Sequence, residues 1–124
     1  MDARLLQDFL TVRGTSATNP ATQIIQPSYG WLDLGDFEDI VLYCDVRETT
    51  PTAQLTYETA PAANDSAFVP LIPLFTMSVG LTTTNIPAFL AKVPPARFLR
   101  WRVTGDGTPF DVTFRIWLAA YGWA

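Results

Sequence analysis

Two segments alternate polar and apolar residues, and they read Arg97-Phe-Leu-Arg-Trp-Arg-Val103 and Phe110-Asp-Val-Thr-Phe-Arg-Ile-Trp-Leu118. This two-residue period is typical of a half-buried β-strand. The residues between them, Gly105-Asp-Gly-Thr-Pro109, are turn formers. Together the three pieces predict a long antiparallel hairpin.

The alternation assigns the side chains of this hairpin to two faces. We expect one face to lie in the core, and it carries Leu99, Trp101, Val103, Phe110, Val112, Phe114 and Ile116. The outward face carries Arg100, Arg102, Arg115 and Trp117. In a hairpin the first two arginines would lie near Asp111, Thr113 or Arg115 of the partner strand. We interpret these charges as a solvated ladder, with a partner-binding face as the alternative.

Further segments show the same period. Ile40 to Arg47 and Gln54 to Thr59 alternate in this way, and we expect them to pair with each other, which would bring Arg47 near Glu58. Leu6 to Arg13 fits either a helix or an edge strand, and we favour the strand.

The remaining chain adds short strands and loops. Phe68 to Phe75 contains two prolines and reads as an edge strand, since proline cannot donate to a ladder. Val79 to Thr84 reads as a short strand. About eight strands without a convincing internal helix predict an all-β fold, an antiparallel β-sandwich of jelly-roll type. We expect residues 1–124 to form one domain, with residues 1–20 as an N-terminal arm or edge strand.

The composition limits the partners. Hydrophobic residues make up 48% and charged residues only 16%, so we expect part of the apolar surface to meet another protein. The net charge is −4 with Lys92 as the single lysine, which disfavours direct contact with nucleic acid or an acidic membrane. No targeting or membrane-spanning segment is recognisable, so we expect synthesis in the cytoplasm.

Catalytic and metal-binding patterns are weak. The chain has no histidine, and its one cysteine, Cys44, falls on the apolar side of a strand, where we interpret it as a buried hydrophobe. Four acids, Asp33, Asp36, Glu38 and Asp39, cluster at a turn, but they lack the ordered spacing of a calcium loop. We therefore predict a protein that is not an enzyme, with no catalytic residue, metal or cofactor.

Aromatic residues complete the candidate surface. Trp117 lies on the polar side of its strand, and Tyr121 and Trp123 follow it, so we expect these rings to contact a neighbouring subunit. The predicted partner-binding residues are Arg100, Arg102, Arg115, Trp117, Tyr121 and Trp123. Exposed rings also stack on sugars, which keeps a carbohydrate-binding module as an alternative.

Three pieces of the sequence carry a resemblance to a known class of proteins. They are Trp31-Leu-Asp-Leu-Gly-Asp-Phe37, Leu55-Thr-Tyr-Glu-Thr-Ala-Pro61 followed by a polar loop, and Arg97-Phe-Leu-Arg-Trp-Arg-Val103. From Trp31 onward the chain resembles small β-sandwich accessory proteins of tailed-bacteriophage heads, the decoration or head-associated proteins. Similar pieces occur in discoidin-like and carbohydrate-binding sandwiches.

The phage resemblance implies a virion structural protein that performs no chemistry. Its expected partner is the major capsid protein or another head protein, its expected state a homo-oligomer, and its expected location the virion after synthesis in the host cytoplasm. The expected function is to bind and stabilise a capsid lattice. The alternative is a carbohydrate-binding β-sandwich module that uses exposed aromatics.

Overall fold

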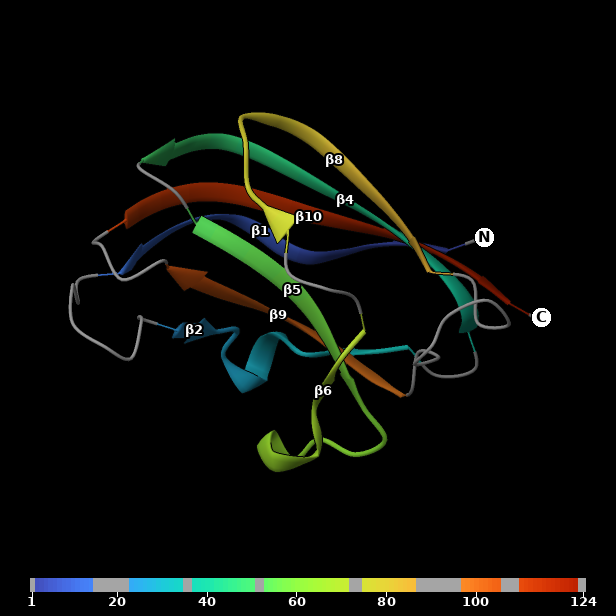
Figure 1. The fold of residues 1–124 in the computed structure, drawn as a ribbon. Helices are drawn as coiled ribbons and strands as arrows, with labels where there is room; N and C mark the ends of the chain where they lie inside the picture. The colour runs from blue at the N-terminus through green and yellow to red at the C-terminus, as the bar shows by residue number, and fades with distance from the viewer. Residues whose placement is uncertain are drawn as a thin grey trace.

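The computed structural model describes residues 2–14, 23–34, 37–50, 53–71, 75–86, 97–105 and 110–122. Within these ranges the chain forms strands and two short 3-10 helices, arranged in two layers (Figure 1). The elements are β1 (Asp2–Gly14), β2 (Gln23–Ile25), η1 (Ser28–Gly30), β3 (Leu32–Asp33), β4 (Phe37–Thr50), β5 (Ala53–Ala60), η2 (Asp65–Ala67), β6 (Val69–Pro70), β7 (Phe75–Thr76), β8 (Gly80–Ile86), β9 (Phe98–Gly105) and β10 (Phe110–Gly122).

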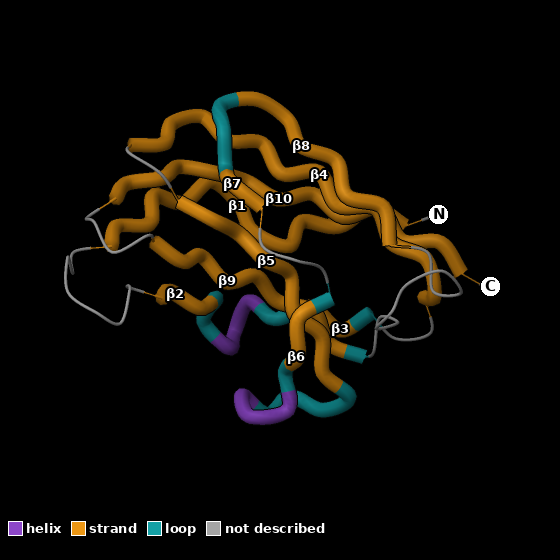
Figure 2. The backbone as a smooth tube through the Cα atoms, viewed as in Figure 1, coloured by secondary structure: helices purple, strands orange, loops and turns teal. Residues whose placement is uncertain are grey.

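Two antiparallel sheets make up the layers. Sheet A has the strand order β1-β10-β4-β8. Sheet B has the order β2-β9-β5-β6, with β3 also paired to β9 and β7 also paired to β5. Figure 2 shows the long strands of the two sheets stacked, with both 3-10 helices on the far side of sheet B. The protein is therefore an all-β sandwich, as the sequence predicts, and the jelly-roll type stays a prediction.

The core lies between the inner faces of the two sheets. Sheet A contributes Leu6, Val12, Ile40, Leu42, Cys44, Val46, Phe110, Val112, Phe114, Ile116 and Leu118, all buried. Sheet B contributes Ala53, Leu55, Tyr57, Leu99, Trp101 and Val103. Trp101 packs edge-on against Phe114 across the core, with ring centroids 5.1 Å apart. The inward faces predicted from the two-residue period are confirmed.

The predicted strand pairings are wrong in two places. β9 pairs with β2, β3 and β5 in sheet B, whereas β10 pairs with β1 and β4 in sheet A, so the two strands form no hairpin. β4 and β5 likewise lie in opposite sheets. The chain therefore passes from one sheet to the other between β4 and β5 and again between β9 and β10. An alternating strand buries one face whether the next strand in sequence pairs with it in the same sheet or packs opposite it in the other sheet. The two-residue period therefore does not tell a hairpin from a connection between sheets.

β1 is an edge strand of sheet A and part of the core. It pairs with β10 from Asp2 to Gly14 with two register shifts. The Gln26 amide donates a hydrogen bond to the backbone oxygen of Leu6 (2.8 Å), and the Trp101 indole donates one to Gln7 Oε1 (3.1 Å). These contacts tie β1 to sheet B as well as to sheet A.

Candidate functional site

The outer face of sheet A, which points away from sheet B, carries rows of side chains across all four strands. One row runs from Leu5 in β1 through Trp117 in β10 and Tyr43 in β4 to Thr83 in β8. The two-residue period places these residues outward because their neighbours in each strand point into the core.

The apolar part of this face is exposed. Trp117 is 41% exposed, Leu5 38% and Leu81 62%. A shallow hollow of about 350 Å³ lies among Ala3, Tyr43, Leu81, Trp117, Leu118 and Ala119. Of the residues that line this hollow, only Tyr43 and Trp117 have a polar atom in the side chain, and the lining is almost wholly apolar. We call the face formed by Ala3, Leu5, Tyr43, Leu81 and Trp117 the apolar face of sheet A.

Charged residues border the apolar face and pair with one another. Asp45 accepts from Arg47 at 3.3 Å and lies 3.8 Å from Arg115. The Arg115 guanidinium also lies over the rings of Phe9 (4.3 Å) and Trp117 (5.4 Å). The charged side chains at this border of the apolar face therefore lie against one another and against aromatic rings.

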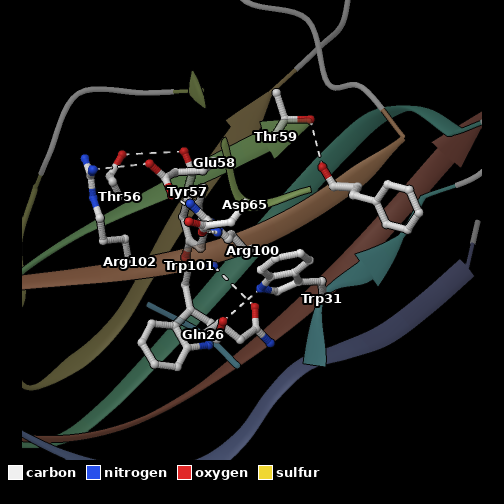
Figure 3. A network of polar contacts seen from close by, with 11 residues as sticks. Gln26, Trp31, Thr56, Tyr57, Glu58, Thr59, Asp65, Arg100, Trp101 and Arg102 are labelled. Atoms are coloured by element: carbon white, nitrogen blue, oxygen red, sulfur yellow. Dashed lines mark hydrogen bonds and ion pairs between the residues drawn. The ribbon is translucent and has the colours of Figure 1, made fainter. Parts of the chain in front are cut away.

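Arg100 occupies a buried cluster on the other side of the molecule (Figure 3). Its side chain is only 5% exposed, and Nε donates to Glu58 Oε1 at 2.8 Å while a terminal nitrogen donates to Asp65 at 2.5 Å. The rings of Phe68 (3.9 Å) and Trp31 (5.2 Å) enclose the guanidinium. Arg100 points away from the core, as the strand period predicts, but the prediction that it meets solvent is wrong, because the segments that carry Trp31 and Phe68 cover this part of the outer face of sheet B.

Arg102 lies beside this cluster and is partly exposed. Its guanidinium is 3.3 Å from Glu58 Oε2, so Glu58 is held by two arginines. The expected approach of Arg47 to Glu58 does not occur, since these residues lie in opposite sheets. Arg100 and Arg102 do not lie near Asp111, Thr113 or Arg115 either, because β9 and β10 belong to different sheets.

The six predicted partner-binding residues are therefore not on one face. Arg115 and Trp117 lie on the outer face of sheet A, and Arg100 and Arg102 on that of sheet B. Tyr121 lies in β10 opposite Asp39, and the description does not extend to its side chain. Trp123 lies outside the described residues.

The predicted partner-binding residues do not include Ala3, Leu5, Tyr43 and Leu81 of the apolar face, although the strand period marks some of them as outward. Tyr43 alternates with Leu42 and Cys44, which marks it as outward, and Leu81 has the same parity as the outward Thr83. A pattern identifies an outward side chain, but it does not tell which outward positions of four strands come together.

Acidic and thiol groups offer little chemistry. Asp33 binds Arg97 at 3.2 Å, Asp36 lies outside the described residues, and the side chains of Glu38 and Asp39 are not described. The described ranges contain no group of three or more acidic, cysteine or histidine residues that could hold a metal ion. Burial, and next the charge of Asp45, raise the pKa of the Cys44 thiol to about 12.

One negative finding concerns membranes. Among the described residues, helices of the length and hydropathy required for a membrane span are absent.

Comparisons with known proteins give no family. No protein-family model matches the chain, and no curated protein matches its sequence. Among solved structures it is similar to a chain described under "Bacillus endospore appendages form a novel family of disulfide-linked pili". The identity is 12%, the TM-score 0.43, and the match covers 100% of this chain and 93% of that one. This likeness is too low to say anything about function.

Proposed function

We propose that this chain is a non-enzymatic structural protein that binds a repeating protein lattice through the apolar face of sheet A. The lattice implied by the sequence resemblance is a viral capsid, with the major capsid protein or another head protein in direct contact. The observation that carries the proposal is an exposed apolar surface, four strands wide, with Trp117 and Leu81 at 41% and 62% exposure.

Such a surface suits another protein. Exposed apolar patches rimmed by polar residues mark protein interaction sites, and tryptophan and tyrosine are enriched at interface centres. The paired charges of Asp45, Arg47 and Arg115 form the polar rim. A lattice with repeated sites would hold many copies firmly even where each single contact is weak.

A sugar fits the apolar face less well. Carbohydrate recognition combines ring stacking with hydrogen bonds to hydroxyl groups, and specificity comes from placed polar groups. The hollow offers the rings of Trp117 and Tyr43 but few polar atoms. A glycan array tests this alternative, and saturable sugar binding that disappears in Trp117→Ala would favour it.

The first experiment asks whether the chain is part of a particle. Virus particles from the encoding strain are purified on a density gradient and their proteins are quantified by mass spectrometry. We expect the chain to migrate with the major head protein at a fixed ratio. Its absence from every particle fraction would contradict the proposal.

The second experiment asks which face binds. Particles that lack the chain are incubated with added purified protein, and the bound fraction is measured by sedimentation. We expect Trp117→Ser to weaken binding at least about tenfold, since hot-spot truncations cost 2 kcal/mol or more. The matched control is Tyr29→Ser, because Tyr29 is 92% exposed and lies in η1 on the side of sheet B. If Trp117→Ser and Tyr29→Ser bind the particles equally well, the apolar face of sheet A is not the binding surface.

A further inference from the structure

β8 is a regular strand at one edge of sheet A. All of its residues, Gly80–Ile86, pair with Ile40–Val46 of β4 without a register shift. β8 ends the strand order of sheet A, so within the described residues its other side has no neighbouring strand. Every second residue of such a strand directs its N–H and C=O groups to the free side, where they can pair with another strand.

The two edges of sheet A differ in how they are protected. β1, the opposite edge, is interrupted by two register shifts and carries Arg4, Asp8 and Arg13. β8 reads Gly80-Leu-Thr-Thr-Thr-Asn-Ile86 and contains neither a charged residue nor a proline. Charges, prolines and bulges are the devices by which edge strands avoid pairing. β8 lacks them, so its edge is suited to accept a strand.

We propose that β8 pairs antiparallel with β8 of a second copy of this chain, about a two-fold axis at Thr83. In this register Thr83 faces the partner's Thr83, and Thr82 faces the partner's Thr84. Cross-strand threonine pairs are favourable, and no like charges meet because the strand is uncharged. An isologous two-fold contact is also the commonest way in which identical chains associate.

The apolar face supports a second copy as the occupant of this edge. Leu81 belongs both to β8 and to the hollow beside Trp117 and Tyr43. Pairing of two β8 strands would join two sheets into one and place both apolar faces on the same side. The dimer then presents a double-width apolar surface, which would raise its avidity for a repeating lattice. Pairing of β8 does not depend on which lattice the chain binds.

Charge placement at Thr83 tests both the pairing and its register. Thr83 is exposed, so Thr83→Lys and Thr83→Asp should each fold as the wild type does, which thermal unfolding checks. Like charges brought directly opposite each other at a protein interface are strongly destabilising, so each variant alone should dissociate at least about tenfold more readily in sedimentation equilibrium. A mixture of the two variants should associate again, because lysine then faces aspartate. Thr76→Lys, at an exposed position in β7 of sheet B, is the matched control and should stay dimeric.

A cysteine at the same position gives an independent measurement. Thr83→Cys should form a disulfide-linked dimer on mild oxidation, whereas Thr76→Cys should not, and the native Cys44 is buried and does not interfere. The inference is overturned if the wild type is monomeric at about 1 mM, or if neither charge variant changes the association. A monomeric wild type that still binds particles would overturn the β8 pairing alone. A dimer that binds no particles would overturn the proposed function alone.

Discussion

Arg100 and Glu58 form an ion pair that is almost fully buried on the outer face of sheet B. Removing one partner of such a pair leaves the other charge uncompensated, at a usual cost of about 3–5 kcal/mol. We expect Arg100→Met to lower the free energy of unfolding by about 3 kcal/mol in urea denaturation. The low end of the range applies because Arg102 remains 3.3 Å from Glu58.

An exposed ion pair provides the control for this prediction. Arg47 contacts Asp45 at 3.3 Å, but its side chain is 63% exposed, so Arg47→Met should cost less than about 1 kcal/mol. The double variant Glu58→Leu with Arg100→Met should be more stable than Arg100→Met alone, because it removes the buried Glu58 carboxylate, and the two charges that lose a partner, Arg102 and Asp65, are partly or largely exposed. Equal losses for Arg100→Met and Arg47→Met would contradict the structural role of the cluster.

The raised pKa of the Cys44 thiol leads us to expect that the free energy of unfolding decreases at alkaline pH. Its pKa is raised from 9.0 to about 12 in the folded protein, by burial first and then by Asp45. Between these values the unfolded chain loses the proton while the folded chain keeps it. The contribution is therefore fully present below pH 9 and is lost as the pH rises toward 12. Within this window the group lowers the free energy of unfolding by up to about 1.4 kcal/mol per pH unit.

Urea denaturation of Cys44→Ala between about pH 8 and pH 10.5 measures this contribution. The variant should lose stability less steeply with pH than the wild type does. Some alkaline loss should persist, because burial also raises the pKa of Tyr57 well above 10.0. Identical pH slopes for the two proteins would show that the thiol does not contribute.

The last residue of β1 packs directly beneath an aromatic ring. Gly14 pairs with Phe110 of β10, and a Cβ added at Gly14 would overlap the buried ring. We expect Gly14→Ala to cost about 1–3 kcal/mol, since extra atoms in a packed site force side chains to move. Amide hydrogen exchange should be faster at the Gly14 end of β1. Arg13→Ala, next to it but exposed, should leave the exchange unchanged, and a similar effect of both variants would contradict this packing.

The strands and their buried faces were predictable from the sequence. In β10, Phe110, Val112 and Phe114 alternate with polar residues, and burial follows that parity because a strand presents successive side chains to opposite faces. The pairing was not predictable in the same way. β9 and β10 have matching apolar faces, and two such strands can bury them side by side in one sheet or opposite each other across the core.

The candidate site was predictable only in part. Trp117 was expected to point outward and does so, because it alternates with the buried residues Ile116 and Leu118 of β10. Arg100 also has outward parity, yet it is buried, since Phe68 and Trp31 come from segments far away in the sequence and cover it. The alternation of residues within a strand cannot predict such burial, because it depends on segments that are distant in the sequence.

The molecule as a whole is built from pairings between distant strands. β1 pairs with β10, β4 with β10 and β8, and β5 with β9, whereas β4 and β5, consecutive in the chain, lie in opposite sheets. Loop closure must precede such pairings, so folding is slow compared with that of helical proteins. We expect a main folding phase of milliseconds to seconds, measured by stopped-flow fluorescence of the tryptophans, including the buried Trp101.

Slow folding phases caused by proline isomerisation must be distinguished from the main folding phase in this experiment. The chain has ten prolines, and their isomerisation takes about 10–100 s at 25 °C. Added prolyl isomerase should accelerate only the slower phases and leave the main phase unchanged. A main phase faster than about 0.1 ms would contradict the expectation from topology.

The antiparallel pairing of β1 with β10 also sets how the sandwich responds to mechanical load. Asp2 faces Ala120 at one end of this pair, and Gly14 faces Phe110 at the other. Tension that separates Asp2 from Ala120 acts along the interstrand hydrogen bonds, which lie perpendicular to the strands and therefore break one after another. Tension along the strands would instead load many bonds together. Sheet A is thus weaker against peeling of β1 from an end of the pair than against tension along its strands.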